Sequence, residues 1–375
     1  MKILYFVDRL RHGGIQTFLY NYISNMDLSK NEISLLLLDD GKTYSLEEEF
    51  MKLGVKLYKL SNIWINKPFD YIKYKNAIDS FFAQHNDFDI VHLHSSSKNY
   101  YILKCAEKYN IPVRIAHSHN TGFQTNNPMK VFIGNRMKSR LKKYANYYFA
   151  CSDLAAKWLF ESTDNVRIIR NAVDLSKFRF NPEKRAAIRK KLSISDNLAI
   201  CNIGRLEKQK NHDFLLEIFA EVVKLNSNAK LYLIGEGSLK KELMKKVDIL
   251  AISDNTHFLG YRSDVADLLQ AMDIILMPSL YEGFPITAVE AQAEGVPCIF
   301  SNTITAEANL LPETCYLSLK DSPKEWAKTV IDIYSTYCRD DKKDELTKAG
   351  FNLQEETSKL IKFYEQAVEG ERKLL

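Results

Sequence analysis

The chain has 375 residues and a formal net charge of +5, with 46% hydrophobic and 26% charged residues. This length predicts two domains, each able to bury its own core, and the proportions are those of an ordinary globular protein. The mild positive charge permits anionic ligands or a membrane surface and does not indicate nucleic acid. No apolar run approaches the ~20 residues that span a bilayer, so we expect any membrane contact to be peripheral.

Cysteine usage and the first residues favour a cytoplasmic protein. The six cysteines form no CxxC pair, and several lie in apolar runs, where cysteine is usually a small buried hydrophobe. No signal-peptide pattern precedes the first apolar run. We therefore expect a reducing compartment, with peripheral contact at the inner face of the cell membrane as the remaining possibility.

The first half of the chain alternates strands and helices. Residues 2–7 predict a buried strand, Gly13 and Gly14 follow it, and residues 15–26 predict a helix. A strand, a glycine pair and a helix are typical of a phosphate-binding loop, although G-x-G-x-x-G is absent and a plain turn fits equally well. The alternation predicts an α/β fold with a doubly wound parallel sheet. Further strands are expected at residues 33–38, 55–60, 90–94, 113–117, 147–150 and 166–169.

Two of these strands end in histidines. His92 and His94 close one strand, and His117 and His119 close another. Side chains alternate along a strand, so His117 and His119 share a face at the sheet edge where ligands bind. The four rings permit a metal site, but no acidic residue is interleaved with them. We therefore expect a polar site for an acceptor and no metal.

Residues 124–144 form the most basic segment of the chain. Apolar residues recur there at helical spacing, which predicts an amphipathic helix with a cationic rim. Two interpretations stay open: a surface helix packed on the sheet, or, through residues 129–144, an interfacial site for anionic lipid headgroups or a lipid-linked acceptor. The basic residues are Lys130, Arg136, Lys138, Arg140, Lys142 and Lys143, and the apolar ones are Phe132, Ile133, Met137, Leu141 and Tyr144.

The second half repeats the alternation, and its first strand opens into a charged loop. Gly204 lets the backbone approach a ligand, and Arg205 and Lys210 place two cations at the carboxyl end of the strand. Such a pair suits a diphosphate, since arginine bonds two oxygens at once; a generic charged loop is the alternative. Strands are expected at residues 198–203, 230–234, 257–259 and 274–277, and helices at 213–225, 239–250, 265–272, 324–337, 341–349 and 355–368.

A tight glycine turn leads from the strand at 274–277 into a helix predicted over 286–294. Gly283 lies in the turn, and Pro285 fits the first helical position, where its missing N–H costs nothing. The first turn of a helix carries unpaired N–H groups and about half a unit of positive charge, which attract phosphate.

Two glutamates flank this helix start. Glu282 lies just before the turn, and Glu290 follows eight residues later, a little over two helical turns along. Two carboxylates around a patch of N–H donors suit a ligand with hydroxyls at both ends and phosphates in the middle, which describes a nucleotide sugar. Two solvated helix carboxylates are the simpler alternative.

Several segments, in this order, resemble the GT-B-fold glycosyltransferases, in particular the large retaining family 4. Glu282 and Glu290 resemble its E-x7-E motif, and Arg205 and Lys210 resemble its G-R-L-x-x-x-K motif. The order of the motifs is more specific than any one of them, and the resemblance covers nearly the whole chain. The remaining segments are the linker at residues 170–178, the G-x-G turn at 235–237 and the strand end at 260–262.

The resemblance implies two Rossmann-like, doubly wound domains that face an interdomain cleft. Residues 1–178 would bind the acceptor and residues 179–351 the nucleotide sugar. The C-terminal helix, from about residue 352 to 375, would pack back on the first domain.

The resemblance also assigns roles to individual residues. Arg205 and Lys210 would bind the pyrophosphate, Glu282 the sugar hydroxyls and Glu290 the ribose hydroxyls. Either His117 or His119 would contact the donor sugar or the acceptor. Further donor contacts are expected at Gly14, which approaches the phosphate, at Gly235 in the G-x-G turn, at Tyr261 and Arg262 near the nucleobase, and at Gly283, Phe284, Pro285 and Ile286 around the helix start.

By the same resemblance the activity is a retaining hexosyl transfer from a nucleotide-diphosphate sugar, with UDP the expected nucleotide. The acceptor would be a saccharide, lipid-linked, in capsular or exopolysaccharide assembly. No metal or other cofactor is required if two cations and a helix dipole stabilise the leaving diphosphate. The alternatives are a non-catalytic GT-B partner or glycan-binding subunit, and a UDP-sugar epimerase.

Overall fold

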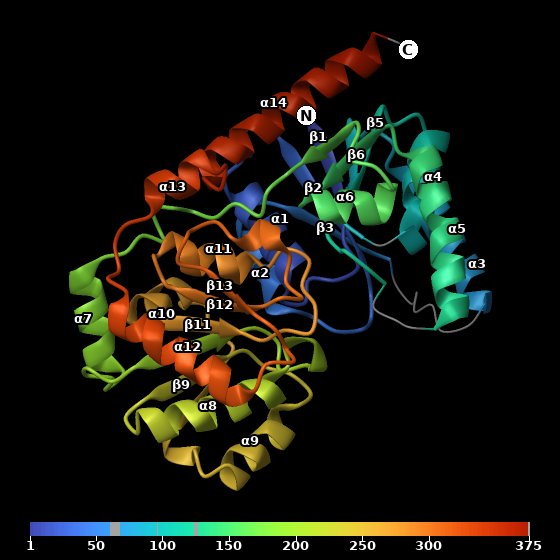
Figure 1. The fold of residues 1–375 in the computed structure, drawn as a ribbon. Coiled ribbons are helices and arrows are strands. Elements are labelled where there is room, and N and C mark those ends of the chain that lie inside the picture. The colour runs from blue at the N-terminus through green and yellow to red at the C-terminus, as the bar shows by residue number, and fades with distance from the viewer. Residues whose placement is uncertain (61–67, 96, 124–126, 374–375) are drawn as a thin grey trace. The chain divides into compact units, whose positions relative to one another are not determined.

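The structure is a computed structural model that describes residues 1–60, 68–95, 97–123 and 127–373. The chain forms two compact units, Met1–Ala172 with Leu353–Leu375, and Val173–Asn352. Each unit contains one parallel sheet with helices between successive strands, which confirms the predicted α/β class (Figure 1). None of the described helices combines the length and the apolar composition needed to cross a bilayer.

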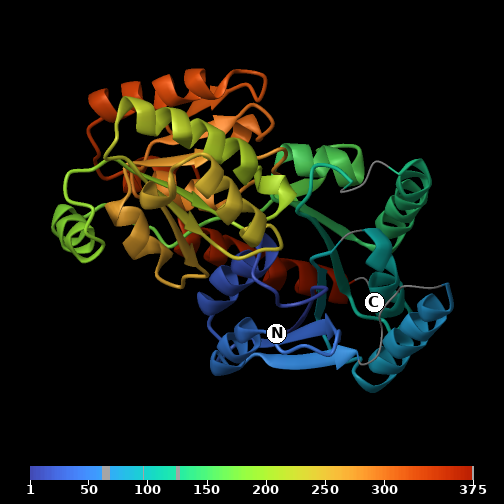
Figure 2. The same cartoon turned by 90° about the horizontal axis from the view of Figure 1, so that it is seen from below.

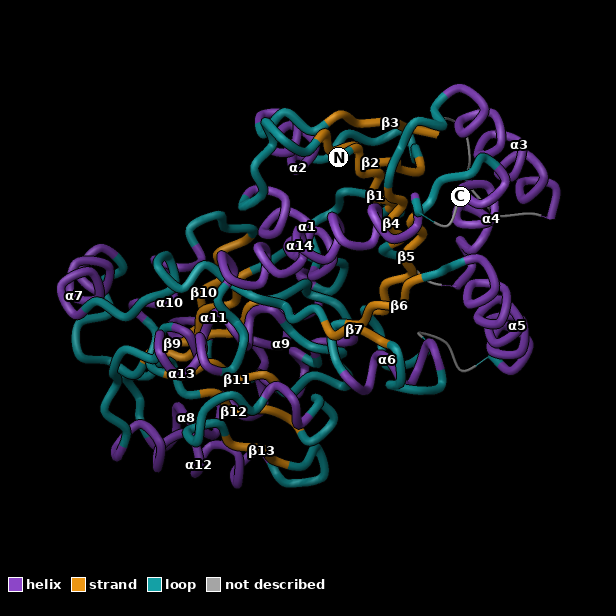
Figure 3. Tube along the Cα trace, turned by 90° about the horizontal axis from the view of Figure 1, so that it is seen from above, coloured by secondary structure: helices purple, strands orange, loops and turns teal. Residues whose placement is uncertain are grey.

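The first unit holds a seven-stranded sheet in the order β3-β2-β1-β4-β5-β6-β7 (Figure 3). Every pairing in it is parallel, and β1 lies between β2 and β4, so that Ile3 pairs with both Ile33 and Ile90. The strands are β1 (Lys2–Phe6), β2 (Glu32–Leu38), β3 (Lys56–Leu60), β4 (Ile90–Leu93), β5 (Val113–Ser118), β6 (Tyr147–Ala150) and β7 (Val166–Ile168).

Helices connect these strands, and α4 and α5 pack against each other (Figure 1). Asn127 caps α5, because its side chain accepts a hydrogen bond from the Lys130 backbone N–H. Residues 124–126 of the predicted amphipathic segment lie outside the described residues. The helices of this unit are α1 (Gly14–Ser24), α2 (Ser45–Lys52), α3 (Pro68–Gln84), α4 (Tyr100–Lys108), α5 (Pro128–Tyr144), α6 (Asp153–Phe160) and α14 (Leu353–Arg372).

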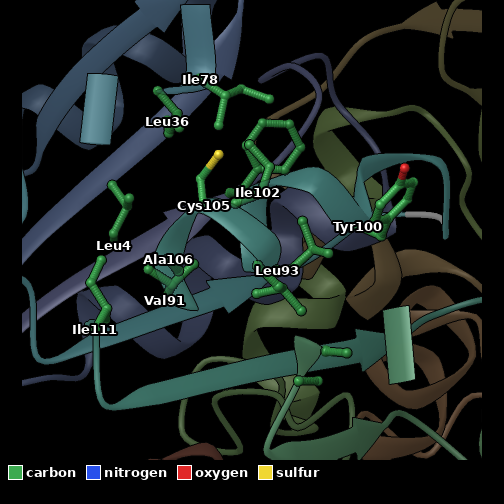
Figure 4. Packing of buried hydrophobic residues seen from close by; sticks show 14 of the residues in the cluster. Leu4, Leu36, Ile78, Val91, Leu93, Tyr100, Ile102, Cys105, Ala106 and Ile111 are labelled. Atoms are coloured by element: carbon green, nitrogen blue, oxygen red, sulfur yellow. The ribbon is translucent and has the colours of Figure 1, made fainter. Parts of the chain in front are cut away.

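The two faces of the first sheet differ in chemistry. Val91 and Leu93 of β4 point into an apolar cluster that includes Leu4 of β1 and Ile102 of α4 (Figure 4). Because strand side chains alternate, the intervening His92 lies on the opposite face, where it meets other polar aromatic groups. One face of this sheet therefore provides a core, and the other carries the histidines.

The last helix, α14, completes the histidine face of the first sheet. Its Tyr364 is fully buried, and the Tyr364 hydroxyl lies 3.1 Å from the Tyr5 hydroxyl and 2.7 Å from His92 Nδ1. Helix α14 also contacts α1 and β5. The end of the chain is therefore part of the unit that its beginning builds.

The second unit holds a six-stranded parallel sheet in the order β10-β9-β8-β11-β12-β13. Two short strands, β12 and β13, extend it beyond the strands that the sequence predicted. Its strands are β8 (Ala199–Ile203), β9 (Lys230–Ile234), β10 (Thr256–Gly260), β11 (Ile274–Met277), β12 (Cys298–Ser301) and β13 (Cys315–Leu317).

Helices α8 and α12 of this unit pack against each other (Figure 2) and bury Trp326 completely. Leu216, Phe219 and Val330 belong to the same apolar cluster as Trp326. The helices of the unit are α7 (Pro182–Lys191), α8 (His212–Leu225), α9 (Lys240–Ile249), α10 (Val265–Ala271), α11 (Ile286–Ala293), α12 (Pro323–Thr336) and α13 (Lys343–Lys348).

Candidate active site

The loop after β8 lies against the loop after β9, backbone to backbone. The Gly204 N–H donates to the Ile234 carbonyl at 2.9 Å, and the Leu206 N–H donates to the Glu236 carbonyl at 3.1 Å. Both loops start at the carboxyl ends of neighbouring parallel strands, the edge where ligands bind in such sheets. The fold therefore brings the G-R-L segment, residues 204–206, against the G-x-G turn, residues 235–237.

Glycine is required at one point of this contact and leaves room for a side chain at another. Gly235 has a φ of +142°, and a Cβ there would lie 1.9 Å from the Gly204 carbonyl oxygen. At Gly204 a Cβ would lie 2.5 Å from Cε of Lys210. The two glycines let the loops stack, and the lysine side chain passes over Gly204.

Three of the four charged residues singled out by the sequence belong to one network. Lys210 Nζ lies 2.7 Å from Oε1 of Glu282, with the two side chains only 13% and 9% exposed. Gln209 connects Arg205 to this pair, because its side-chain oxygen accepts from the guanidinium at 3.3 Å and its amide donates to Glu282 at 3.3 Å. The Ser279 hydroxyl donates to the same carboxylate at 3.1 Å.

Gln209 is a site residue that the sequence reasoning missed. It lies in the short 3₁₀ turn Lys208–Lys210, and its backbone carbonyl accepts from the Leu280 N–H at 2.8 Å. Its amide also donates to the Tyr281 carbonyl at 3.0 Å. The sequence could have indicated Gln209 only through its position between Arg205 and Lys210, the two predicted diphosphate ligands.

Helix α11 begins at residue 286 as predicted, but Pro285 is not its first helical residue. Pro285 is the N-cap, with an extended backbone, and Ile286 is the first helical residue. The first turn carries no acidic residue, so its N–H groups and positive dipole end are not neutralised from within the helix. The ring of Phe284, just before the cap, stacks on Phe351 at 5.6 Å between centroids.

Glu290 lies further along α11, apart from the Lys210 ion pair. Its side chain is buried, with 8% exposed, and burial raises its pKa to about 7, while the charge of Lys177 acts in the opposite direction. Glu294, one turn on, is fully buried and bonded to Arg339 at 3.0 Å, and burial raises its pKa to about 8. The end of α11 is thereby fixed in the unit.

The segment after β10 adjoins the same loops. The Gly235 N–H donates to the Gly260 carbonyl at 2.8 Å, so the strand end at 260–262 lies beside the G-x-G turn. The Tyr261 ring is about half exposed. Arg262 is held by Asp264, with nitrogen to oxygen distances of 2.7 and 2.5 Å.

The histidines of the first unit form a cluster of their own. His92 Nε2 lies 3.1 Å from His117 Nδ1, and His94 Nδ1 lies 2.9 Å from His119 Nε2. Burial lowers the pKa of all four rings, that of His119 to about 3, and neighbouring imidazoles add to this for the other three. His117 is buried, whereas His119 is partly exposed. The rings are therefore neutral near pH 7.

Gly14 is the first residue of α1, and a Cβ at this position would have nothing within 4 Å. The neighbouring Gly13 is different, since a Cβ there would lie 2.9 Å from the side-chain oxygen of Gln16. The protein itself therefore leaves space beside Gly14.

Helix α5 is basic as predicted, but one of its cations does not lie on the predicted rim. Lys138 is buried instead of lying on the rim, because its ammonium donates to the Trp158 carbonyl at 2.6 Å and lies over the Phe123 and Trp158 rings. Phe132 and Ile133 are 59% and 44% exposed, so these two of the predicted apolar residues do not pack on the sheet.

Comparisons with known proteins identify the class of the chain. Residues 184–352 match the family model of glycosyl transferases group 1, and residues 12–177 match that of glycosyltransferase family 4. Both units thus have the sequence pattern of one class of enzyme. The chain belongs to the family 4 glycosyltransferases of the GT-B fold.

Individual relatives agree with this assignment. EpsF of Bacillus subtilis, whose name assigns it to the glycosyltransferases, is 29% identical over 98% of this chain and 97% of its own. The N,N'-diacetylbacillosaminyl-diphospho-undecaprenol alpha-1,3-N-acetylgalactosaminyltransferase of Campylobacter jejuni is 25% identical over 78% of this chain and 79% of its own. The crystal structure of Anabaena HepE with UDP and glucose has a TM-score of 0.76 at 16% identity, and the match covers 99% of both chains.

Proposed function

We propose that this glycosyltransferase moves a hexosyl unit from a UDP-sugar to a saccharide carried on a polyprenyl diphosphate lipid, with retention of the anomeric configuration. The Lys210 to Glu282 pair beside Arg205 is the observation that carries the donor assignment. The names of relatives that act on diphosphoundecaprenol-linked sugars support the acceptor, and the UDP complex of a structural relative supports the nucleotide.

The donor diphosphate is assigned to Arg205, Lys210 and the N–H groups at the start of α11. Arg205 is exposed and has one 3.3 Å hydrogen bond to Gln209, so its guanidinium can turn toward a ligand. Lys210 is already held at the carboxyl end of β8. Two cations and a helix end offset the charge of a diphosphate without a metal ion.

The two glutamates are assigned to hydroxyl groups at the ends of the donor. Glu282 binds the sugar ring and Glu290 binds the ribose, in accordance with the E-x7-E pattern. Burial gives the Glu290 carboxyl a pKa of about 7, so near neutral pH it can accept from a hydroxyl as the carboxylate or donate to one as the acid. Tyr261 and Arg262 are assigned to the nucleobase, and Gly235 to the donor-binding turn beside them.

During transfer the bond between the anomeric carbon and the leaving phosphate oxygen breaks as the acceptor oxygen bonds to the same face of the carbon. A leaving-phosphate oxygen takes the proton of the acceptor hydroxyl, so no protein base is needed. Arg205 and Lys210 stabilise the charge that develops on the diphosphate. Gly14 leaves room for the donor phosphate, and the partly exposed His119, rather than the buried His117, contacts the sugar or the acceptor.

A lipid-linked acceptor requires the enzyme to reach a membrane surface, and α5 supports peripheral contact at the cytoplasmic face. The 17 residues of this helix include no Asp or Glu. The apolar side chains of Met129, Phe132 and Ile133 are exposed at its N-terminal half, next to Lys130 and Arg136. Apolar groups bordered by cations suit an interface with anionic lipid headgroups.

A donor panel followed by product analysis tests the proposal. UDP-, GDP- and ADP-sugars are first compared by thermal shift, and we expect a UDP-sugar to stabilise the protein most. The best donor is then incubated with a polyprenyl diphosphate saccharide, and we expect UDP release only with acceptor and an α-linked product from an α-linked donor. Release of an isomerised UDP-sugar without acceptor would show an epimerase, and an inverted product would refute retention.

A further inference from the structure

Three buried histidines on the polar face of the first sheet are close enough to share one ligand. His92, His94 and His117 each place a ring nitrogen within 4.8 Å of those of the other two. Their side chains are exposed by 1% or less. They come from adjacent strands, two from the end of β4 and one from β5.

A methionine at the end of this cluster sets the direction of its hydrogen bonds. The Tyr5 hydroxyl donates to Sδ of Met26 at 3.9 Å, and a thioether sulfur can only accept. The Tyr5 oxygen therefore accepts from the Tyr364 hydroxyl at 3.1 Å. The Tyr364 oxygen in turn accepts from His92 Nδ1 at 2.7 Å, which places the His92 proton on Nδ1 and a lone pair on Nε2.

This direction leaves one acceptor unused at the other end of the chain of hydrogen bonds. His92 Nε2 accepts from His117 Nδ1 at 3.1 Å, so His117 Nε2 bears a lone pair. Among the described residues that atom has no hydrogen-bond partner, and neither has His94 Nε2; both atoms are buried. Buried ring nitrogens are normally paired, so two neighbouring unpaired ones indicate a ligand that contacts both.

We propose that His94 and His117 bind a divalent ion of the zinc class through their Nε2 atoms, with His92 supporting the site as the acceptor of the His117 Nδ1 proton. Imidazole nitrogen suits Zn²⁺, Co²⁺, Ni²⁺ and Cu²⁺, whereas Mg²⁺ and Ca²⁺ need oxygen ligands. The site is therefore separate from any Mg²⁺ that accompanies a nucleotide diphosphate.

The surrounding geometry is that of a supported metal site. Zinc to nitrogen bonds of about 2.0–2.1 Å place tetrahedral ligand atoms about 3.4 Å apart, and the His94 and His117 ring centroids lie 4.8 Å apart, so one ion is within reach of both rings. Ligating histidines in proteins usually donate their second ring N–H to a neighbour. His117 already donates from Nδ1 to His92, and His94 Nδ1 lies 2.9 Å from His119, whose partial exposure offers a path for the ion.

Cobalt titration of the full chain, free of any histidine tag, tests this site without using transferase activity. The protein is stripped with a chelator, dialysed and titrated with Co²⁺ in the absence of nucleotide. We expect one Co²⁺ per chain with the visible absorption of a four-coordinate ion, its displacement by Zn²⁺ and a higher thermal midpoint with Zn²⁺. Binding of Mg²⁺ at the same site would contradict the assignment.

Variants locate the ion. His94→Gln and His117→Gln should each weaken Co²⁺ binding at least tenfold, whereas His257→Gln, a half-buried histidine on β10 of the other unit, should bind like the wild type. X-ray absorption on the wild-type zinc form should show nitrogen ligands of the imidazole type, and it serves if a variant fails to fold. The proposal would be overturned by a wild-type chain that binds no stoichiometric Co²⁺, by Co²⁺ binding as tight in either variant as in the wild type, or by sulfur ligation.

Discussion

Replacing Arg205 and Lys210 separately by alanine should separate catalysis from stability. Both side chains are assigned to the leaving diphosphate, so each variant should lose roughly 10²-fold or more in kcat/KM, or about 2.7 kcal/mol of transition-state stabilisation. Their surroundings differ, however. Arg205 is exposed, with one 3.3 Å hydrogen bond to Gln209, whereas Lys210 forms a 2.7 Å ion pair with Glu282.

The difference in burial sets the expected cost to the fold. Loss of the exposed Arg205 side chain should change the free energy of unfolding by less than about 0.5 kcal/mol. Loss of Lys210 leaves the Glu282 carboxylate, 9% exposed, with only the Ser279 hydroxyl and the Gln209 amide. This cost lies between those of an exposed and a fully buried pair, at roughly 1–3 kcal/mol.

Steady-state transfer with the identified UDP-sugar measures kcat/KM, and urea unfolding of the same preparations measures the free energy of unfolding. Lys208→Ala is the matched control, because Lys208 lies in the same turn and is exposed. Lys208→Ala should change neither kcat/KM nor the free energy of unfolding. Full transfer by either Arg205→Ala or Lys210→Ala would refute the diphosphate assignment. Equal unfolding free energies for Lys210→Ala and wild type would refute the importance of the ion pair.

Four further changes have expected outcomes. The free energy of unfolding of Glu290→Gln should be compared with that of the wild type as a function of pH. The raised pKa of Glu290 stabilises the wild-type fold fully below pH 4.5, and this contribution is lost as pH rises through about 7, so above pH 7 the variant should gain up to about 3 kcal/mol relative to the wild type. Parallel stability curves for the two proteins would contradict the raised pKa. Gly235→Ala should destabilise by roughly 3 kcal/mol or prevent folding, by urea titration, because its Cβ meets backbone; near-wild-type stability would disprove the steric argument. Gly14→Ala should keep the thermal midpoint and lose transfer activity, since only a ligand competes for that space; unchanged kcat/KM would remove Gly14 from the site. Phe132→Ser with Ile133→Ser should weaken sedimentation with anionic liposomes several-fold while transfer to a water-soluble acceptor persists; undiminished sedimentation would exclude α5.

The strands and loops of the donor unit could be predicted because their signals are local. Arg205 and Lys210 follow a buried strand within a few residues, and this places them at its carboxyl end. The ion pair between Lys210 and Glu282 could not be predicted, since it depends on β8 and β11 being neighbours although 70 residues separate these strands. Strands β12 (Cys298–Ser301) and β13 (Cys315–Leu317) were not predicted.

The same limit applies to the first unit. Side-chain alternation correctly put His117 and His119 on one side of β5, where their rings stack 4.1 Å apart. The hydrogen bond from His92 to Tyr364 spans 272 positions of sequence and has no local signal. On α5 the helical period was right, but the rim position predicted for Lys138 was wrong, because the Trp158 carbonyl and two aromatic rings bind its ammonium inward.

The position of α14 has a consequence for the biogenesis of the protein. Residues 353–372 supply Tyr364 to a sheet whose first strand starts at Lys2, while the whole second unit is encoded between them. During translation the N-terminal sheet therefore emerges without the helix that supplies Tyr364, and that helix follows only after the whole second unit has been made. Loss of residues 353–372 alone should consequently destabilise the unit that is made first, although the lost segment lies more than 180 residues beyond the last strand of its sheet.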